Sequence, residues 1–227
     1  MKGQVAMVRA SLAAGICLLI SSSMASRITL ANGPSQVHPT SEDPPVDRVT
    51  PDFAAVLVDP EWTVVALPAY QQTLDYSCGA AVAMTAATHF GKMLTSEWTA
   101  ATEASISQEI GANQWVGAMP WRLRSWLNAK GMRGENDRDG SLDEIVARLQ
   151  QGDLTAVAWS AWGGHWSIVI GYNKRLKKVA LADPADVTDD RRDGITYLDE
   201  AVFLNNWYTP PATLLTSGIY VTIPRPR

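Results

Sequence analysis

The segment from Cys78 to Gly91 constrains the fold most strongly, because it is small and apolar on every side. Its sequence, C-G-A-A-V-A-M-T-A-A-T-H-F-G, predicts a helix that is buried all round rather than an amphipathic surface helix. Gly91 is a typical helix end. The segment from Gln72 to Ser77 is polar and turn-like, so Cys78 is expected in the first turn of this central helix.

A cysteine in the first turn of a helix lies close to unpaired backbone N–H groups and to the positive end of the helix dipole. Both favour the thiolate, which is the nucleophilic form. Gly79 leaves the backbone bare beside the sulfur of Cys78, so a substrate carbonyl could approach closely. The alternative is that Cys78 is a small buried core residue, as many free cysteines are.

The first 25 residues have the pattern of a secretory signal peptide. Lys2 and Arg9 are basic, Ala10 to Ile20 is an apolar run, and Ser23-Met24-Ala25 offers small residues for cleavage. The apolar run is too short to span a bilayer comfortably. We therefore expect a mature chain that begins near Ser26, is exported to the periplasm or secreted, and keeps no stable membrane insertion.

Cleavage of this signal would remove Cys17 and leave Cys78 as the sole cysteine. An intramolecular disulfide is then impossible. A lone thiol in an oxidising compartment favours a functional role for Cys78, and a nucleophile is the role we expect.

Charge and composition argue against several classes of function. The whole sequence has 19 basic and 23 acidic residues, and loss of the signal peptide leaves 17 basic ones. Nucleic-acid binding would need a basic face that this acidic chain lacks. The chain has three histidines and no paired-cysteine spacing, so we expect no metal site and no cofactor. The sequence does not indicate the oligomeric state.

The order of expected elements predicts an α+β domain with an antiparallel sheet. Residues 26–61 are rich in proline and polar residues and are expected to be a tether or pro-segment, with one domain over 62–227. The helices are expected at 78–91, 96–110 with Ser96 as N-cap, 120–131, 141–151 and 199–207. The strands are expected at 63–67, 154–160, 165–172, 179–183 and 218–223.

A general base for Cys78 can be sought among the three histidines. His38 lies in the proline-rich segment, and His89 lies about 16 Å along the helix axis from Cys78. His165 remains, and it opens a predicted strand directly after Gly163-Gly164.

The strand of His165 and the next predicted strand form a hairpin if the chain turns around Lys174. His165 would then lie directly opposite Asp183, with Cβ atoms about 5 Å apart. The same register pairs Ser167 with Leu181 and Val169 with Val179. Asp183 is thus expected to orient the imidazole, as the third member of a catalytic triad does. The alternative is a purely structural His–Asp contact; Asp186, Asp189 and Asp190 fit this register less well.

Attack on a carbonyl creates an oxyanion that needs hydrogen-bond donors. The backbone N–H of Cys78 can supply one, and the side-chain amide of Gln72 can supply a second. Gln71 is the competing candidate, because adjacent residues of an extended segment point in opposite directions.

These residues resemble those of the papain-like cysteine peptidases, and within them the bacteriocin-processing, double-glycine peptidase family and its stand-alone relatives. The resemblance rests on Gln72, on Cys78-Gly79-Ala80-Ala81, on His165-Trp166 and on Asp183-Pro184 in this chain order. It implies a papain-like fold with the cysteine helix packed on the sheet, and a thiol hydrolase acting on peptides or proteins. No transporter segments follow, which departs from the fused members and leaves a double-glycine leader substrate open.

Two other functions use the same residues. The acyl-enzyme could pass to an amine, as in transglutaminase-like or phytochelatin-synthase-like acyl transferases. The chain could instead be an inactive peptide-binding module, in which Trp159, Trp162 and Trp166 line a recognition groove. Packing of these tryptophans in the core or cleft is the alternative to that groove.

Overall fold

The computed structural model describes residues 59–67, 69–137, 139–160, 164–186, 194–208 and 218–225. The expected signal peptide and nearly all of the proline-rich segment lie outside these ranges, and so does Trp162. The predicted boundaries of signal, tether and domain therefore stay predictions.

Over the described residues the sheet has seven strands, and each pair of neighbours runs antiparallel. Six of them follow the order β2 (Glu135–Asp137), β7 (Tyr220–Ile223), β3 (Leu154–Trp159), β4 (His165–Asn173), β5 (Lys178–Ala182) and β6 (Ile195–Asp199). The short strand β1 (Trp62–Val64) pairs with the far end of β4. The predicted strands are confirmed to within a few residues, whereas β2 and β6 were not predicted.

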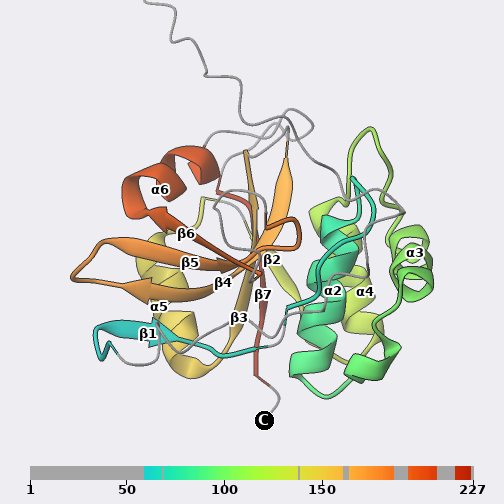
Figure 1. Ribbon diagram of the computed structural model, residues 1–227, viewed down its shortest axis with the longest axis horizontal. Coiled ribbons are helices and arrows are strands. Elements are labelled where there is room, and N and C mark those ends of the chain that lie inside the picture. The colour runs from blue at the N-terminus through green and yellow to red at the C-terminus, as the bar shows by residue number, and fades with distance from the viewer. Residues whose placement is uncertain are drawn as a thin grey trace, which may run out of the picture. The chain divides into compact units, whose positions relative to one another are not determined.

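Helices cover the sheet on both sides (Figure 1). They are α2 (Cys78–His89), α3 (Ala100–Glu109), α4 (Pro120–Ala129), α5 (Leu142–Gln151) and α6 (Glu200–Tyr208). The first three lie together on one side of the sheet, and α5 and α6 lie on the other. Every residue of β3 and β4 is buried, which is the pattern of strands covered on both faces. The predicted α+β class is confirmed.

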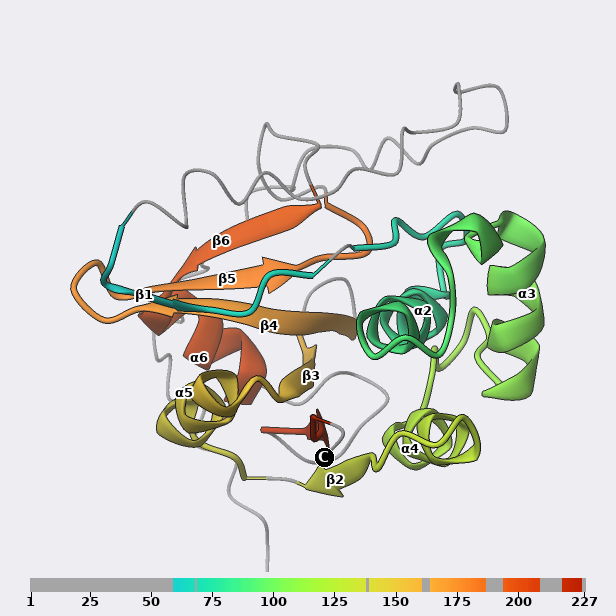
Figure 2. The ribbon, with the colours of Figure 1, turned by 90° about the horizontal axis from the view of Figure 1, so that it is seen from below.

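Helix α2 is the buried central helix that the sequence predicts. All residues from Cys78 to Ala87 are buried, because their small side chains let the neighbouring elements approach closely. Its first turn lies beside the end of β4 that starts at His165 (Figure 2). The helix ends at His89, and Gly91 follows with the positive φ of 66° that favours glycine. His89 therefore lies at the opposite end of α2 from Cys78.

The predicted N-cap of the next helix is wrong. Ser96 lies in a short 3-10 turn, Thr95–Glu97, and α3 begins only after Thr99. The hydroxyl of Thr99 accepts a hydrogen bond from the N–H of Thr102 at 3.0 Å. The indole of Trp98, which is buried, donates to the Thr88 hydroxyl and anchors the turn before the helix.

The register predicted for the β4–β5 hairpin is also wrong. Val169 pairs with Leu181, not with Val179, because the chain turns between Asn173 and Lys178, later than predicted. A β-bulge also lies between Val169 and Gly171. The extra residue, Ile170, gives its carbonyl to the N–H of Val65 at 2.8 Å. The shift is three residues next to the turn, and the bulge reduces it to two. A shift of two keeps the side chains of β4 from His165 to Val169 on their predicted face.

Candidate active site

Cys78 is the first residue of α2, and the turn before it leaves the helix end open. Cys78 is a free cysteine, buried to 5% exposure. Ser77 precedes it as N-cap residue but makes no side-chain capping bond to the first turn. The Ser77 hydroxyl instead donates to the Leu74 carbonyl at 2.7 Å. The N–H groups of the first turn of α2 are thus left uncapped by Ser77, and they are the donors that favour a negative charge there.

His165 and Asp183 are brought together, although not as direct partners across the hairpin. The imidazole Nε2 lies 2.6 Å from Oδ1 of Asp183. In the observed register Asp183 is diagonal to His165, and diagonal side chains on one face remain within reach of each other. Two more donors fix the carboxylate: the N–H of Ala185 at 3.1 Å and the Thr196 hydroxyl at 2.8 Å.

Cys78 is the second neighbour of the imidazole. A side-chain hydrogen bond and a charge interaction link Cys78 to His165. Because Nε2 faces Asp183, Nδ1 is the ring nitrogen left for the thiol. The ring of Trp159 lies edge-on to the imidazole, with centroids 5.8 Å apart.

The charges of this cluster support one another. Burial lowers the pKa of His165, but the charge and hydrogen bond of Asp183, aided by Cys78, outweigh burial and raise that pKa to about 10. Burial raises the pKa of Asp183, yet the charge of His165 and the hydrogen bonds to this carboxylate outweigh it, so the pKa is lowered. The pair is therefore held as imidazolium and carboxylate.

The two candidate glutamines take different positions. Gln71 donates its side-chain amide to the Asp183 carbonyl at 2.9 Å. Gln72 donates its backbone N–H to the Pro184 carbonyl at 2.8 Å and its side-chain amide to the Leu74 carbonyl at 2.7 Å. The Gln71 side chain thus points toward Asp183, whereas Gln72 is held in the turn that ends at Cys78. No hydrogen bond from Gln72 to Cys78 is formed among the described residues.

Gly79 has a different role from the one expected. A Cβ at this position would lie 2.4 Å from the Cβ of Ala118, a separation that real Cβ atoms essentially never show. Ala118 is held there by its carbonyl, which accepts from the indole of Trp166 at 2.8 Å. The space beside Gly79 is therefore filled by the loop before α4 and not left to a substrate.

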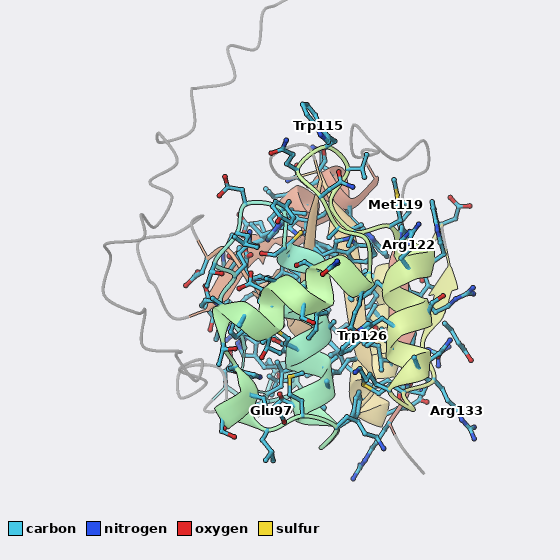
Figure 3. The ribbon with its side chains drawn as sticks, turned by 90° about the vertical axis from the view of Figure 1, so that its right-hand side faces the viewer. Glu97, Trp115, Met119, Arg122, Trp126 and Arg133 are labelled. Atoms are coloured by element: carbon cyan, nitrogen blue, oxygen red, sulfur yellow. The ribbon has the colours of Figure 1, made fainter. Side chains whose placement is uncertain are left out.

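Of the three tryptophans considered for a recognition groove, the two that the structure describes are core residues. Trp159 and Trp166 are each 3% exposed, and their indoles donate to Ser167 and to Ala118. Trp115 is different, because it is 79% exposed at the tip of the loop before α4 (Figure 3). Its backbone N–H is held by the side chain of Asn113 at 3.0 Å.

Two polar residues near this site were missed in the sequence. Thr196 lies on β6, a strand that was not predicted, and it binds the Asp183 carboxylate. Glu103 is fully buried in α3 and binds the turn before Cys78. Its neighbours A-A-T-E-A-S do not distinguish it from a solvent-facing acid on a helix. The apolar face of α3, with Ile106 three residues later, is the only available signal.

Over the described part of the chain, no three His, Cys, Asp or Glu side chains gather in a way that could hold a metal ion. Among the helices described above, none has the length and apolarity needed to cross a membrane.

Known proteins resemble this chain in structure rather than in sequence. No protein-family profile and no curated protein matches it. A double glycine motif protease from an AMS/PCAT transporter, solved in complex with the leader peptide, has a TM-score of 0.52 and 14% identity, covering 71% of this chain and 94% of that one. A Bacillus anthracis protein described as a C39-like peptidase has a TM-score of 0.50 and 10% identity, covering 69% and 94%.

At such low identity the similarity shows the fold alone. The chain has the fold of the double-glycine, papain-like peptidase domains, as the residue pattern predicted.

Proposed function

We propose that this protein is an exported cysteine peptidase that hydrolyses peptide bonds through Cys78, His165 and Asp183. The observation that carries the proposal is the chain of contacts from the thiol to the imidazole and from the imidazole to a buried carboxylate at 2.6 Å. The fold shared with peptidase domains supports the same reaction class. One of the similar structures holds a leader peptide, which supports a peptide as substrate here.

In the first half of the reaction the sulfur of Cys78 forms a bond to the carbonyl carbon of the substrate. The thiol proton resides on His165, which the raised pKa of the imidazole favours. The carbonyl oxygen becomes an oxyanion, and the backbone N–H of Cys78 and the amide of Gln72 donate to it. The amide nitrogen of Gln72 carries two hydrogens, of which one is used by Leu74.

The tetrahedral intermediate collapses when the C–N bond breaks and His165 gives its proton to the leaving amine. An acyl-enzyme remains on Cys78. Water then loses a proton to His165 and attacks the thioester, and the sulfur leaves as the thiolate beside the imidazolium, which restores the starting state. Asp183 keeps the imidazole oriented throughout, and it does not itself take up the proton.

Alkylation of Cys78 tests the proposal and separates it from a binding module. Iodoacetamide should label Cys78 in the native protein near about pH 6, because the protonated imidazole stabilises the thiolate. Hydrolysis of a peptide library should disappear in step with labelling, located by mass spectrometry. The His165→Ala variant should be labelled more slowly at the same pH.

Two results would point elsewhere. If Cys78, which is only 5% exposed, reacts only after denaturation, the peptidase proposal fails and an inactive peptide-binding module becomes the better account. If an added amine is joined to the acyl product in place of water, the same triad serves acyl transfer.

A further inference from the structure

One buried carboxylate, that of Glu103 in α3, binds the segment that leads into Cys78. Its oxygens accept from the Tyr70 hydroxyl at 2.9 Å, from the Thr73 hydroxyl at 2.6 Å and from the Thr73 backbone N–H at 2.8 Å. The Ser77 hydroxyl shares its one hydrogen between the same carboxylate and the Leu74 carbonyl. Glu103 thus holds the beginning, the middle and the end of the segment from Tyr70 to Ser77.

The contacts explain why an acidic side chain can be fully buried here. Glu103 has no exposed surface, and burial of a carboxyl group is costly unless hydrogen bonds replace water. Within the described residues Glu103 takes part in no ion pair. The hydrogen bonds to Glu103 in this cluster all come from one segment of chain, Tyr70 to Ser77. This carboxylate is therefore specific to that segment.

The bound segment carries both proposed oxyanion donors. Gln72 immediately precedes Thr73, and Ser77 immediately precedes the N–H of Cys78. The segment is also tied to the residues that follow β5, because the N–H of Gln72 donates to the Pro184 carbonyl at 2.8 Å. Small movements of an oxyanion donor are costly for catalysis, since its effect depends on fixed geometry.

We propose that Glu103 is a positioning residue, which fixes the N–H of Cys78 and the amide of Gln72 where the oxyanion forms. This inference rests on the proposed peptidase function. Glu103 acts through Thr73 and Ser77 and does not touch the substrate.

A comparison of two reactions of Cys78 separates this role from a general effect on the fold. Peptide hydrolysis passes through an oxyanion, whereas alkylation by iodoacetamide does not and needs only the thiolate. A residue that positions oxyanion donors should therefore matter for the first reaction and not for the second. A residue that only supports the fold should affect both reactions together.

The test uses the Glu103→Gln variant of the full chain, which keeps the shape and replaces one accepting oxygen by a donating NH₂ group. We expect kcat for peptide hydrolysis to fall about 10- to 100-fold, on the scale of a displaced oxyanion donor. The alkylation rate of Cys78 should stay within about twofold of the wild type, because the imidazole beside it is unchanged.

Glu109→Gln is the matched control. Glu109 lies on the same helix, is exposed, and accepts from the indole of Trp126 at 2.8 Å, between α3 and α4 (Figure 3). Glu109→Gln makes the same chemical change outside the segment from Tyr70 to Ser77. The kcat for peptide hydrolysis and the alkylation rate of Cys78 should therefore remain those of the wild type.

Hydrogen exchange provides a readout that needs no turnover. The amides of Thr73 and Ser77 should exchange faster in Glu103→Gln, while those of β3 and β4 keep their protection. If Glu103→Gln does not fold, Tyr70→Phe removes one donor only, and it should lower kcat a few-fold with unchanged alkylation.

Unchanged hydrolysis in a folded Glu103→Gln variant would overturn the inference, and so would an equal loss of hydrolysis and alkylation. Unchanged exchange at Thr73 and Ser77 would also overturn it. A wild-type protein that is alkylated but hydrolyses no peptide would instead remove the proposed function, and the exchange result would still decide whether Glu103 holds the segment.

Discussion

The strongest test of the charge arrangement is the Asp183→Asn variant. The Asp183 side chain is fully buried and receives hydrogen bonds from His165, Ala185 and Thr196. Asparagine has nearly the same shape, but it carries no charge and can accept through one oxygen only. The substitution therefore removes the carboxylate that keeps the imidazole protonated, with little change in volume.

The magnitude follows from the pKa of His165. An ordinary histidine has a pKa of 6.5, whereas the pKa of His165 in the folded protein is about 10. This difference in pKa corresponds to roughly 5 kcal/mol. Burial opposes this rise and Cys78 supplies part of it, so about 5 kcal/mol is the net effect on the imidazole and not the share of Asp183 alone. Loss of one partner of a buried ion pair typically costs about 3–5 kcal/mol, which agrees.

The sign of the pH dependence is fixed by the directions of the two pKa values. His165 has a raised pKa, so its contribution to stability is complete below about 6.5 and is lost as the pH rises toward about 10. Asp183 has a lowered pKa, so its contribution is complete above its ordinary value of 3.8 and is lost as the pH falls through its lower folded value. The difference in stability between wild type and Asp183→Asn should be largest between these limits.

The assay is urea unfolding of both proteins at several pH values between about 5 and 10, with kcat/KM for peptide hydrolysis measured alongside. The stability difference should narrow steadily above about pH 6.5, and turnover should fall by about 10²- to 10⁴-fold because the imidazole loses its orienting partner. Asp199→Asn is the control, since Asp199 pairs with Lys178 on the surface and should affect neither quantity much. A stability difference that does not change with pH, or near-normal turnover, would refute this account of the pair.

Two further predictions concern the helix start and the N-terminus. Gly79→Ala should lower the free energy of unfolding by about 1–3 kcal/mol, because the new methyl group meets the Cβ of Ala118. Thermal unfolding of this variant beside the wild type would show whether the clash matters. N-terminal sequencing of the exported protein should return Ser26 as the first residue, and an intact Met1 would exclude the signal peptide.

The sequence was most informative where local chemistry decides the structure. Small residues on all sides of α2 predicted its burial, and Pro120 and Ser141 stand at the starts of the helices they predicted. Of the two histidines that the structure describes, His165 is the one that lies where it could reach Cys78, and the candidate triad could be read from three positions. The structure places Cys78, His165 and Asp183 close together, whereas their roles in catalysis stay predictions.

Interactions distant in the chain could not be read in this way. The β4–β5 register depends on a bulge whose extra residue, Ile170, is stabilised by Val65 from another part of the chain. Thr196 was missed because its strand, β6, was not predicted, and Glu103 because nothing local marks an acid as buried. Each of these positions is determined by a partner that the local sequence does not reveal.

The bonds from Gln71 and Gln72 to the Asp183–Pro184 carbonyls have a consequence for how activity arises. Gln71 and Asp183 are 112 positions apart, so joining them closes a long loop and must await most of the sheet. A folding intermediate that lacks the β4–β5 hairpin therefore cannot contain the complete cluster. On the proposed export route, the chain crosses the membrane with a thiol but without a working peptidase site, and the folding process itself delays activity without a separate inhibitor.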